Sequence, residues 1–250
     1  MSSRLSGAHQ GGGSVQLDVD ISSKSYTSAN GKRQQVIAGM TFTLRRGEVG
    51  VVVGPSGCGK STMLRILAGL DSDYQGKVSQ PAGARLAMVF QEPRLLPWRS
   101  VEDNVRLAAP DVAEDRLSAI FAVLELEGHR SHFPGELSLG LARRAALARA
   151  FAVEPDFLIL DEPLASLDDA LAARLREEIA TLVASRPMIT LLVTHSMDDA
   201  VRLGDRIFLL SSRPARLLHT VPIAVPRAQR SNELIAAIKA DLARLDFSVS

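Results

Sequence analysis

The chain has 250 residues, a formal net charge of +1 and a charged fraction of 23%. This length can bury one sizeable α/β core with a subdomain inserted into it, and the near-neutral charge argues against a nucleic-acid-binding protein. The single cysteine, Cys58, cannot form an internal disulfide, which suits a reducing compartment. No signal sequence is apparent, and no uncharged apolar run approaches the roughly 18 residues that cross a bilayer. We therefore expect a soluble, cytosolic protein whose membrane role, if any, comes through a partner.

The first residues predict a tail followed by antiparallel strands. Residues 1–14 are rich in Ser and Gly and are expected to be disordered. Residues 15–21 alternate apolar and polar side chains, as in a half-exposed strand. After Ser25-Tyr26-Thr27 and a polar turn, a further strand pair is expected around residues 36–44.

A glycine-rich stretch follows that fits the pattern G-x-x-x-x-G-K-S/T. It consists of Gly54, Pro55, Ser56, Gly57, Cys58, Gly59, Lys60, Ser61 and Thr62. The apolar run 49–53 before it predicts a buried parallel strand, and apolar residues at helical spacing over 63–70 predict a helix after it.

This strand, turn and helix have the chemistry of a phosphate site. Glycines let the backbone wrap a phosphate with its N–H groups pointing inward, and the helix N-terminus favours negative charge. Lys60 can add charge at the β- and γ-phosphates, and the Ser61 hydroxyl can ligate Mg²⁺. The stretch therefore predicts a nucleoside triphosphate site.

The middle of the chain changes from strand to helix character. Residues 71–83 are rich in turn signals, and residues 86–90 form an apolar strand that ends at Gln91. Ala- and Leu-rich segments broken by prolines then predict a helical subdomain over about 92–152. Trp98 is expected in the core of this subdomain.

The remaining elements return to alternating strands and helices. Strands are predicted over 157–160 and 189–193, with an amphipathic helix over 168–184 between them. A hairpin over 207–210 and 217–221 follows, and Ser231 is expected to cap a last helix.

Two carboxylates, Asp161 and Glu162, come directly after the strand over 157–160. In open α/β sheets, ligands bind at the carboxyl ends of the strands. Asp161 is therefore expected to hold Mg²⁺ through water, and Glu162 to orient or deprotonate an attacking water.

Several further motifs appear in a fixed order: Gln91, Leu137-Ser138-Leu139-Gly140, Asp161-Glu162, Ser166-Leu167-Asp168 and His195. From about Val15 to Ile223, the chain resembles the ATP-binding cassette of ABC transporters. The resemblance implies an α/β fold of the P-loop NTPase (RecA-like) type, with a mixed sheet core, an N-terminal antiparallel β-subdomain and an inserted α-helical subdomain. It divides the chain into a tail at 1–14, an ATPase domain at 15–225 and a C-terminal helical extension at 226–250.

The resemblance also implies a role for each matching residue. Tyr26 matches the aromatic that stacks on adenine, and Gln91 matches the glutamine that touches Mg²⁺ and the attacking water. His195 matches the switch histidine at the γ-phosphate, so that Gln91, His195, Glu162 and Lys60 form the implied catalytic set. From the residues alone, Gln91 could instead be a solvated strand end, His195 a structural histidine and Tyr26 a packing residue.

Three more residues are implied to act between two subunits. Ser138 and Gly140 match the signature loop that contacts the γ-phosphate held by the opposite protomer, and Asp168 matches the loop that links the two sites. Without the resemblance, Ser138 could be an ordinary helix N-cap.

The signature departs from the usual Leu-Ser-Gly-Gly-Gln. Leu139 replaces the first glycine and Leu141 the glutamine. Leu139 narrows the allowed backbone and Leu141 removes a polar side chain, so we expect an active ATPase that is slower or differently regulated.

Residues 89–98, Ala142-Arg143-Arg144 and residues 212–216 resemble the nitrate, sulfonate and taurine importer ATPases. This resemblance implies a homodimer that binds ATP and Mg²⁺ at the cytoplasmic face of the inner membrane. Its partners would be transmembrane permease subunits and, indirectly, a periplasmic solute-binding protein, with no nucleic acid. The implied function is ATP-driven uptake of a small anionic solute.

Three alternatives stay open at this point. The chain could be a non-transport P-loop enzyme such as a kinase or GTPase, although the order of Gln91, Ser138 and His195 opposes this. It could be the ATPase of an exporter or a lipid-trafficking complex, or an importer ATPase for another solute such as a vitamin precursor.

Overall fold

The computed structural model describes residues 16–28, 30–81 and 83–245. The predicted tail and the last residues of the predicted C-terminal extension lie outside the described residues. The strands are β1 (Gln16–Thr27), β2 (Arg33–Ile37), β3 (Met40–Arg45), β4 (Val49–Val53), β5 (Gln75–Ser79), β6 (Leu86–Val89), β7 (Phe157–Asp161), β8 (Ile189–Thr194), β9 (Arg206–Leu210) and β10 (Leu217–Pro222).

Helices fill most of the chain between and after these strands. The α-helices are α1 (Lys60–Leu67), α2 (Val101–Ala108), α3 (Glu114–Val123), α4 (Leu139–Ala152), α5 (Asp169–Ala184), α6 (Met197–Leu203) and α7 (Asn232–Ala243). Short 3₁₀ turns are η1 (Glu127–His129), η2 (Pro134–Glu136) and η3 (Arg227–Gln229).

The larger sheet has the strand order β10-β9-β4-β8-β7-β6 among the described residues. Strands β9, β4, β8, β7 and β6 are parallel, and β10 pairs antiparallel with β9 as the predicted hairpin. The carboxyl ends of β4, β8, β7 and β6 therefore lie side by side, which is where α/β sheets bind ligands.

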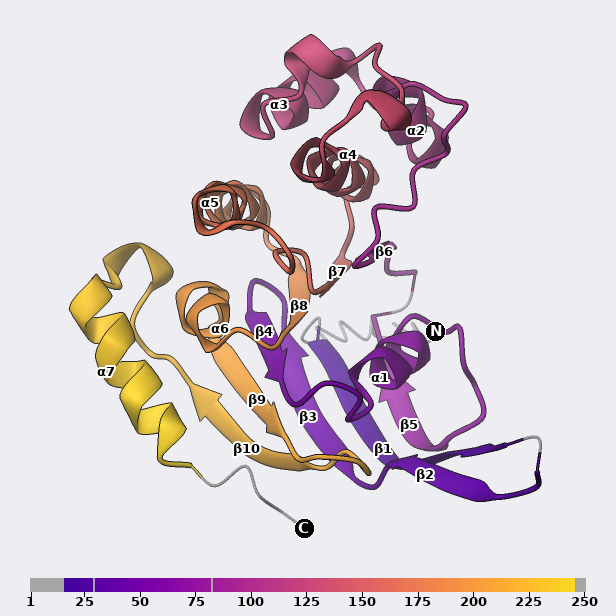
Figure 1. Ribbon diagram of the computed structural model, residues 1–250, viewed down its shortest axis with the longest axis vertical. Coiled ribbons are helices and arrows are strands. Elements are labelled where there is room, and N and C mark those ends of the chain that lie inside the picture. The colour runs from indigo at the N-terminus through magenta and orange to yellow at the C-terminus, as the bar shows by residue number, and fades with distance from the viewer. Residues whose placement is uncertain (1–15, 29, 82, 246–250) are drawn as a thin grey trace, which may run out of the picture.

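The central strands of this sheet are buried on both faces. Val49, Val51 and Val53 of β4 pack with the helices on one face, while Val52 packs with α1, β1 and β3 on the other. The run of buried, mostly β-branched residues is typical of a parallel strand covered on both sides. Figure 1 shows α5 and α6 beside β8 and β9, with α1 beside β1 and β5.

A second, antiparallel sheet has the order β2-β1-β3, and β5 also pairs with β1. Residues 16–21 of the predicted strand and residues 25–27 lie in one long strand, β1, whose register with β2 shifts between Lys24 and Ser25. Strand β5 was not predicted, because its residues over 75–79 are mostly exposed and polar. Strand β5 forms because its backbone pairs with that of β1, although its side chains show no strand pattern.

The helices α2, α3 and α4 lie together at the top of Figure 1, and α4 contacts β6 of the larger sheet. The prediction that Trp98 lies in their core is wrong, because its side chain is 70% exposed. The buried Asn104 accepts a hydrogen bond from the Leu96 N–H at 2.7 Å and donates to the carbonyls of Leu96 and Arg99. These bonds fix the loop on α2 and leave the Trp98 ring outside.

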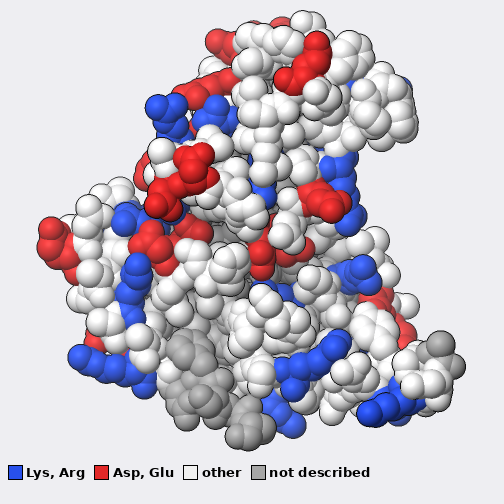
Figure 2. Space-filling model, viewed as in Figure 1, with Lys and Arg blue, Asp and Glu red and all other residues white. Residues whose placement is uncertain are grey.

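The last helix, α7, begins as predicted at Ser231, whose hydroxyl accepts from the Leu234 N–H. Its buried residues Ile235 and Leu242 join the core cluster that contains α5 and α6. Among the described residues, no helix is long and apolar enough to cross a membrane. Figure 2 shows acidic and basic side chains interspersed over the visible face.

Candidate functional site

The loop between β4 and α1 has the backbone of a phosphate cradle. Gly57 has φ 74° and Gly59 φ 134°, which are conformations that favour glycine. A Cβ on Gly59 would lie 3.0 Å from the Val36 carbonyl oxygen. The first N–H groups of α1 have no intrahelical acceptor and point out of its N-terminus, where an anion is stabilised.

Lys60 lies inside this loop and is 7% exposed. Its ammonium donates to the carbonyl oxygens of Gly54 at 2.7 Å and Pro55 at 3.0 Å. Cys58 is buried beneath the loop, and burial raises the pKa of its thiol. The lysine charge is therefore held at the cradle, while the thiol stays protonated as a packing group.

A hollow of about 410 Å³ lies at this edge of the larger sheet. It brings together residues that follow β4, β6, β7 and β9 in the chain. Its lining residues are Ser56, Gly57, Gly59, Lys60, Ser61, Thr62, Gln91, Asp161, Glu162 and Arg213.

The two carboxylates at the carboxyl end of β7, Asp161 and Glu162, differ in their surroundings. Burial raises the pKa of Asp161, and the neighbouring Glu162 charge adds to this shift. Glu162 has φ 47°, and its carboxylate oxygen lies 3.3 Å from Nδ1 of His195. The strand order places these two residues together, because β8 and β7 are neighbours.

The same hollow has the donors for a hard cation. The Ser61 hydroxyl, the Asp161 carboxylate and the Gln91 amide oxygen all belong to residues of its lining. Oxygen donors of this kind suit Mg²⁺, which keeps waters and takes further ligands from a phosphate. The residues present therefore fit a magnesium–nucleotide complex.

The predicted signature residues do not line this hollow. Ser138 caps α4, where its hydroxyl accepts from the Leu141 N–H at 3.3 Å. Asp168 caps α5 by accepting from the Leu171 N–H at 2.9 Å. A Cβ on Gly140 would lie 2.7 Å from Leu171, so α4 and α5 approach closely at their N-termini. Ser138, Gly140 and Asp168 thus lie at the neighbouring N-termini of α4 and α5, outside the hollow.

Tyr26 also lies outside the lining of the hollow. Its hydroxyl donates to Asp71 at 2.9 Å, and the Lys24 ammonium lies 4.6 Å from the centre of its ring. The side chain is 38% exposed. The stacking of Tyr26 on a base stays a prediction.

Two arginines near the site were missed as site residues by sequence reasoning. Arg213 lines the hollow from the loop between β9 and β10. Arg143 of α4 is buried and donates to the Pro163 carbonyl at 3.0 Å, next to Glu162. Both residues lie in segments that carry the importer resemblance, but no pattern in the sequence placed them at the carboxylates.

Comparison with known proteins decides the family. The ABC transporter family model matches residues 37–165. The chain is 40% identical to the aliphatic sulfonates import ATP-binding protein SsuB 2 of Burkholderia cenocepacia, over 88% of this chain and 83% of that protein. The chain belongs to the ABC transporter family. It is also 35% identical to the aliphatic sulfonates import ATP-binding protein SsuB of Bacillus licheniformis, over 85% of this chain and 86% of that protein.

Solved ABC structures share the fold. The structure of an ATP-binding subunit of an ABC transporter is 26% identical, with a TM-score of 0.71, and the match covers 90% of this chain and 99% of that one. The dimeric cassette MJ0796, in a post-hydrolysis state with ADP and Pi, is 22% identical, with a TM-score of 0.70, and covers 84% of this chain and 100% of that one.

These findings confirm the predicted α/β P-loop NTPase fold. As an ABC cassette, the chain is an ATPase that uses ATP with Mg²⁺. The kinase and GTPase alternatives are excluded by the family.

Proposed function

We propose that this ABC ATPase drives an importer for small anionic solutes, with aliphatic sulfonates as the first candidates. The observation that carries the proposal is the similarity of 35–40% identity, over 80–90% of the chain, to aliphatic sulfonates import ATP-binding proteins from several bacteria. Import of nitrate, taurine or another small solute such as a vitamin precursor follows the same mechanism with a different partner.

The hollow at the sheet edge is the proposed ATP site. The backbone N–H groups from Ser56 to Thr62 and the Lys60 ammonium bind the phosphates. Ser61, Gln91 and, through water, Asp161 would hold Mg²⁺, which would supply positive charge to the phosphates. The contact of 3.3 Å between Glu162 and His195 supports their joint action on the attacking water and the γ-phosphate.

A second copy of the chain completes the site. Ser138 and Gly140 lie outside the hollow of their own chain, so they serve the hollow of a partner in a two-fold, head-to-tail homodimer. The N-terminus of α4 then supplies anion-binding N–H groups at the γ-phosphate, and Asp168 links the two sites. Tyr26 packs on the adenine from its place on β1.

The other proposed partners are transmembrane permease subunits and, through them, a periplasmic solute-binding protein. The assembly places the ATPase at the cytoplasmic face of the inner membrane. Trp98, which is 70% exposed in the loop that follows Gln91, is the proposed anchor of the permease contact. An exposed tryptophan is typical of a protein–protein contact site.

The test uses the variant Glu162→Gln, which keeps the ATP contacts and removes the carboxylate. We expect ATP turnover to fall by at least about a hundredfold, while ATP-bound dimers accumulate in size-exclusion chromatography. Lys60→Ala is the matched control, because it weakens ATP binding and gives no such dimer. A normal turnover in Glu162→Gln would remove this residue from its proposed role.

The same tagged variant identifies the partners. It is expressed in its own host, and the proteins that co-purify from ATP-treated membranes are identified by mass spectrometry. A multi-helix permease together with a solute-binding protein supports import, and sulfonate binding by that protein supports the solute. A permease with large extracytoplasmic domains and no binding protein would instead indicate an exporter or a lipid-trafficking complex.

A further inference from the structure

A second hollow, of about 470 Å³, lies where α5, α6 and the segment before α7 meet. None of its lining residues lines the hollow at the phosphate loop. Four arginines from these separate elements line it: Arg176, Arg202, Arg227 and Arg230. Glu177 is the one acidic residue among the described lining residues. We call this hollow the arginine pocket.

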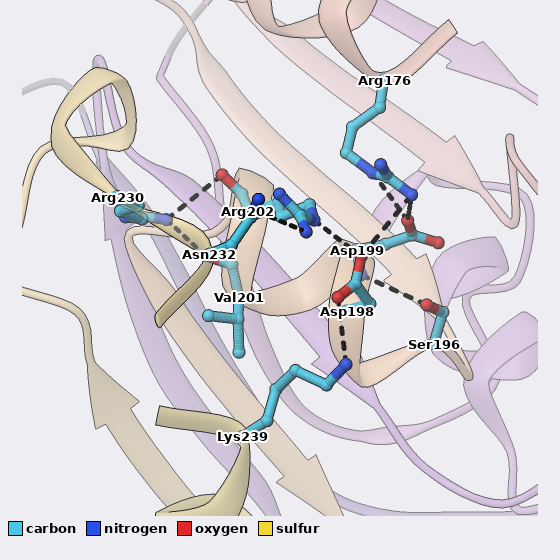
Figure 3. Close-up of polar contacts among 9 residues, drawn as sticks. All are labelled: Arg176, Ser196, Asp198, Asp199, Val201, Arg202, Arg230, Asn232 and Lys239. Carbon is cyan, nitrogen blue, oxygen red and sulfur yellow. Dashed lines mark hydrogen bonds and ion pairs between the residues drawn. The ribbon is translucent and has the colours of Figure 1, made fainter. Parts of the chain in front are cut away.

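Two of the guanidinium groups are held by carboxylates on α6 (Figure 3). Arg176 donates through Nε and Nη2 to Asp199 at 2.9 and 2.7 Å. Arg202 donates through Nε to Asp198 at 2.7 Å and through Nη2 to Asn232 at 3.1 Å. Within the described part of the chain, the Nη1 groups of both arginines make no hydrogen bond. These contacts hold the two groups in place and leave donors for a ligand.

The two arginines of the C-terminal segment differ in their partners. Arg227 contacts Asp205 at 3.4 Å and makes no side-chain hydrogen bond to the described residues. The Arg230 side chain is 1% exposed, and its Nη1 donates to the Val201 and Gly204 carbonyls. Its Nη2 is buried without a hydrogen-bond partner, 3.5 Å from Asp205. A buried guanidinium nitrogen without an acceptor is costly unless a ligand or water satisfies it.

The rest of the lining is apolar or small. Ala180 and Ala184 of α5 line it together with Leu203 and Ile235. The pocket therefore combines fixed cationic donors with an apolar wall, and its volume exceeds that of a bare inorganic anion. Planar guanidinium groups match the geometry of phosphate, sulfonate and carboxylate heads.

We propose that the arginine pocket binds a small organic oxyanion, with its charged head at Arg202 and Arg227 and its apolar part against α5. This site goes beyond the proposed transport function and does not depend on it. Such a ligand bridges α5 and α6 to the segment before α7. Asp168 caps α5, and α6 begins two residues after His195. The bound ligand therefore joins two helices whose first turns lie next to residues proposed to act on ATP.

The test is calorimetric titration of the full-length protein saturated with Mg²⁺ and ADP, so that the phosphate loop is occupied. The probes are 1-butanesulfonate, inorganic sulfate and 1-butanol, which separate the head from the apolar part. We expect 1-butanesulfonate to bind at one site per chain, sulfate to bind at least about fivefold more weakly, and 1-butanol to give no binding. If sulfate binds as tightly as 1-butanesulfonate, the proposal that the ligand is organic is overturned. If 1-butanol binds as tightly as 1-butanesulfonate, the proposal that the ligand has an oxyanion head is overturned.

Two double variants test whether 1-butanesulfonate binds in the arginine pocket. Arg202→Gln with Arg227→Gln should weaken 1-butanesulfonate binding at least about tenfold, because two charged donors are lost. Arg65→Gln with Arg244→Gln changes the net charge equally at exposed positions outside the pocket, and should leave the affinity within about twofold. Equal losses in both double variants would mean that the binding is non-specific and would overturn the proposal.

A second variant does not remove any ion pair. Thr181 is an exposed residue of α5 that lines the pocket, so Thr181→Glu adds a competing carboxylate while all four arginines and their present ion pairs are kept. It should weaken binding at least about fivefold while the melting temperature without ligand stays unchanged. Unchanged affinity in Thr181→Glu, or no binding by the wild-type protein up to about 10 mM 1-butanesulfonate, would overturn the proposal.

Discussion

Glu162 adopts a left-handed backbone conformation, with φ 47°, that is uncommon for a residue with a side chain. Its N–H donates to the Val193 carbonyl of β8 at 2.9 Å, and its own carbonyl accepts from Ala165. The buried Arg143 holds the next carbonyl, that of Pro163, at 3.0 Å. Strand β8 and helix α4 thus fix a conformation that the residue alone would not favour, as is common at functional sites.

Arg143 is therefore expected to act as a positioning residue for Glu162. Arg143→Met keeps the volume but removes the donor, and should lower the ATP turnover number about tenfold with less than a twofold change in KM. Arg143→Lys keeps one donor and should recover part of the loss. Steady-state kinetics checks this, and an unchanged turnover in Arg143→Met would assign Arg143 to packing alone.

The signature substitutions lead to a second prediction at this scale. Leu139 is 48% exposed at the start of α4, whereas Leu141 packs partly buried against the helical core. Leu139→Gly with Leu141→Gln restores the usual signature and should raise ATP turnover by at least about twofold. Leu139→Gly alone is the control for loss of helix stability, and the same turnover in the double variant and the wild type would mean that the departure has no kinetic effect.

At the scale of elements, β1 is tied to the segment that follows α1. The Lys24 side chain is 2% exposed and its ammonium lies 2.8 Å from Asp71 and 3.3 Å from Asp73. Tyr26 adds a hydrogen bond to the same Asp71 carboxylate. Burial alone would raise the pKa of Asp71, but the hydrogen bonds from Lys24 and Tyr26 hold it below its ordinary value. This polar tie orients the β1–β2 hairpin that carries Tyr26.

The contacts of Lys24 and Tyr26 with Asp71 predict that the free energy of unfolding depends on pH. A carboxylate whose pKa is lowered by folding contributes in full above its ordinary pKa near 4, and the contribution is lost as the pH falls through the lowered value. Lys24→Met should therefore lower the free energy of unfolding by about 1–3 kcal/mol at pH 7, with a smaller difference from the wild type at about pH 3.

Urea unfolding at several pH values measures this difference. Lys77→Met is the matched control, because Lys77 is exposed on β5 and forms no ion pair with the described residues. It should change the stability by less than about 0.5 kcal/mol. If Lys24→Met lowers the free energy of unfolding by the same amount at pH 7 and pH 3, Asp71 is not the titrating partner.

The elements and the main site could be predicted from the sequence because their signals are local. The phosphate loop, Asp161 and Glu162 each follow an apolar strand, and parallel strands carry their ends to one edge. Strand β5 has no such signal, because its pairing comes from the β1 backbone. The conformation of Glu162 and its support by Arg143 depend on contacts between distant segments, which periodicity does not reveal.

For the whole molecule, the helices α2 to α4 form the part at the top of Figure 1 and include the signature helix, and Trp98 lies in the loop that leads into α2. One continuous apolar core joins these helices to the larger sheet and α5. Arg144 of α4 adds an ion pair with the largely buried Glu178 of α5. The proposed dimer surface at Ser138 and the proposed permease surface at Trp98 therefore belong to one structural part. Movement of the permease can reach the ATP site through it.

Trp98→Ala tests this coupling in the complex with the permease. The ring is 70% exposed and packs little within the chain, so ATP hydrolysis and the melting temperature of the isolated protein should be unchanged. Removal of a tryptophan anchor commonly costs an interface 2 kcal/mol or more, so recovery of the permease with the tagged ATPase should fall at least about tenfold. Leu70→Ala is the matched control, because Leu70 is also exposed, at 67%, but follows α1 on the sheet part. Equal recovery of the permease by Trp98→Ala and Leu70→Ala would place the permease contact elsewhere on the molecule.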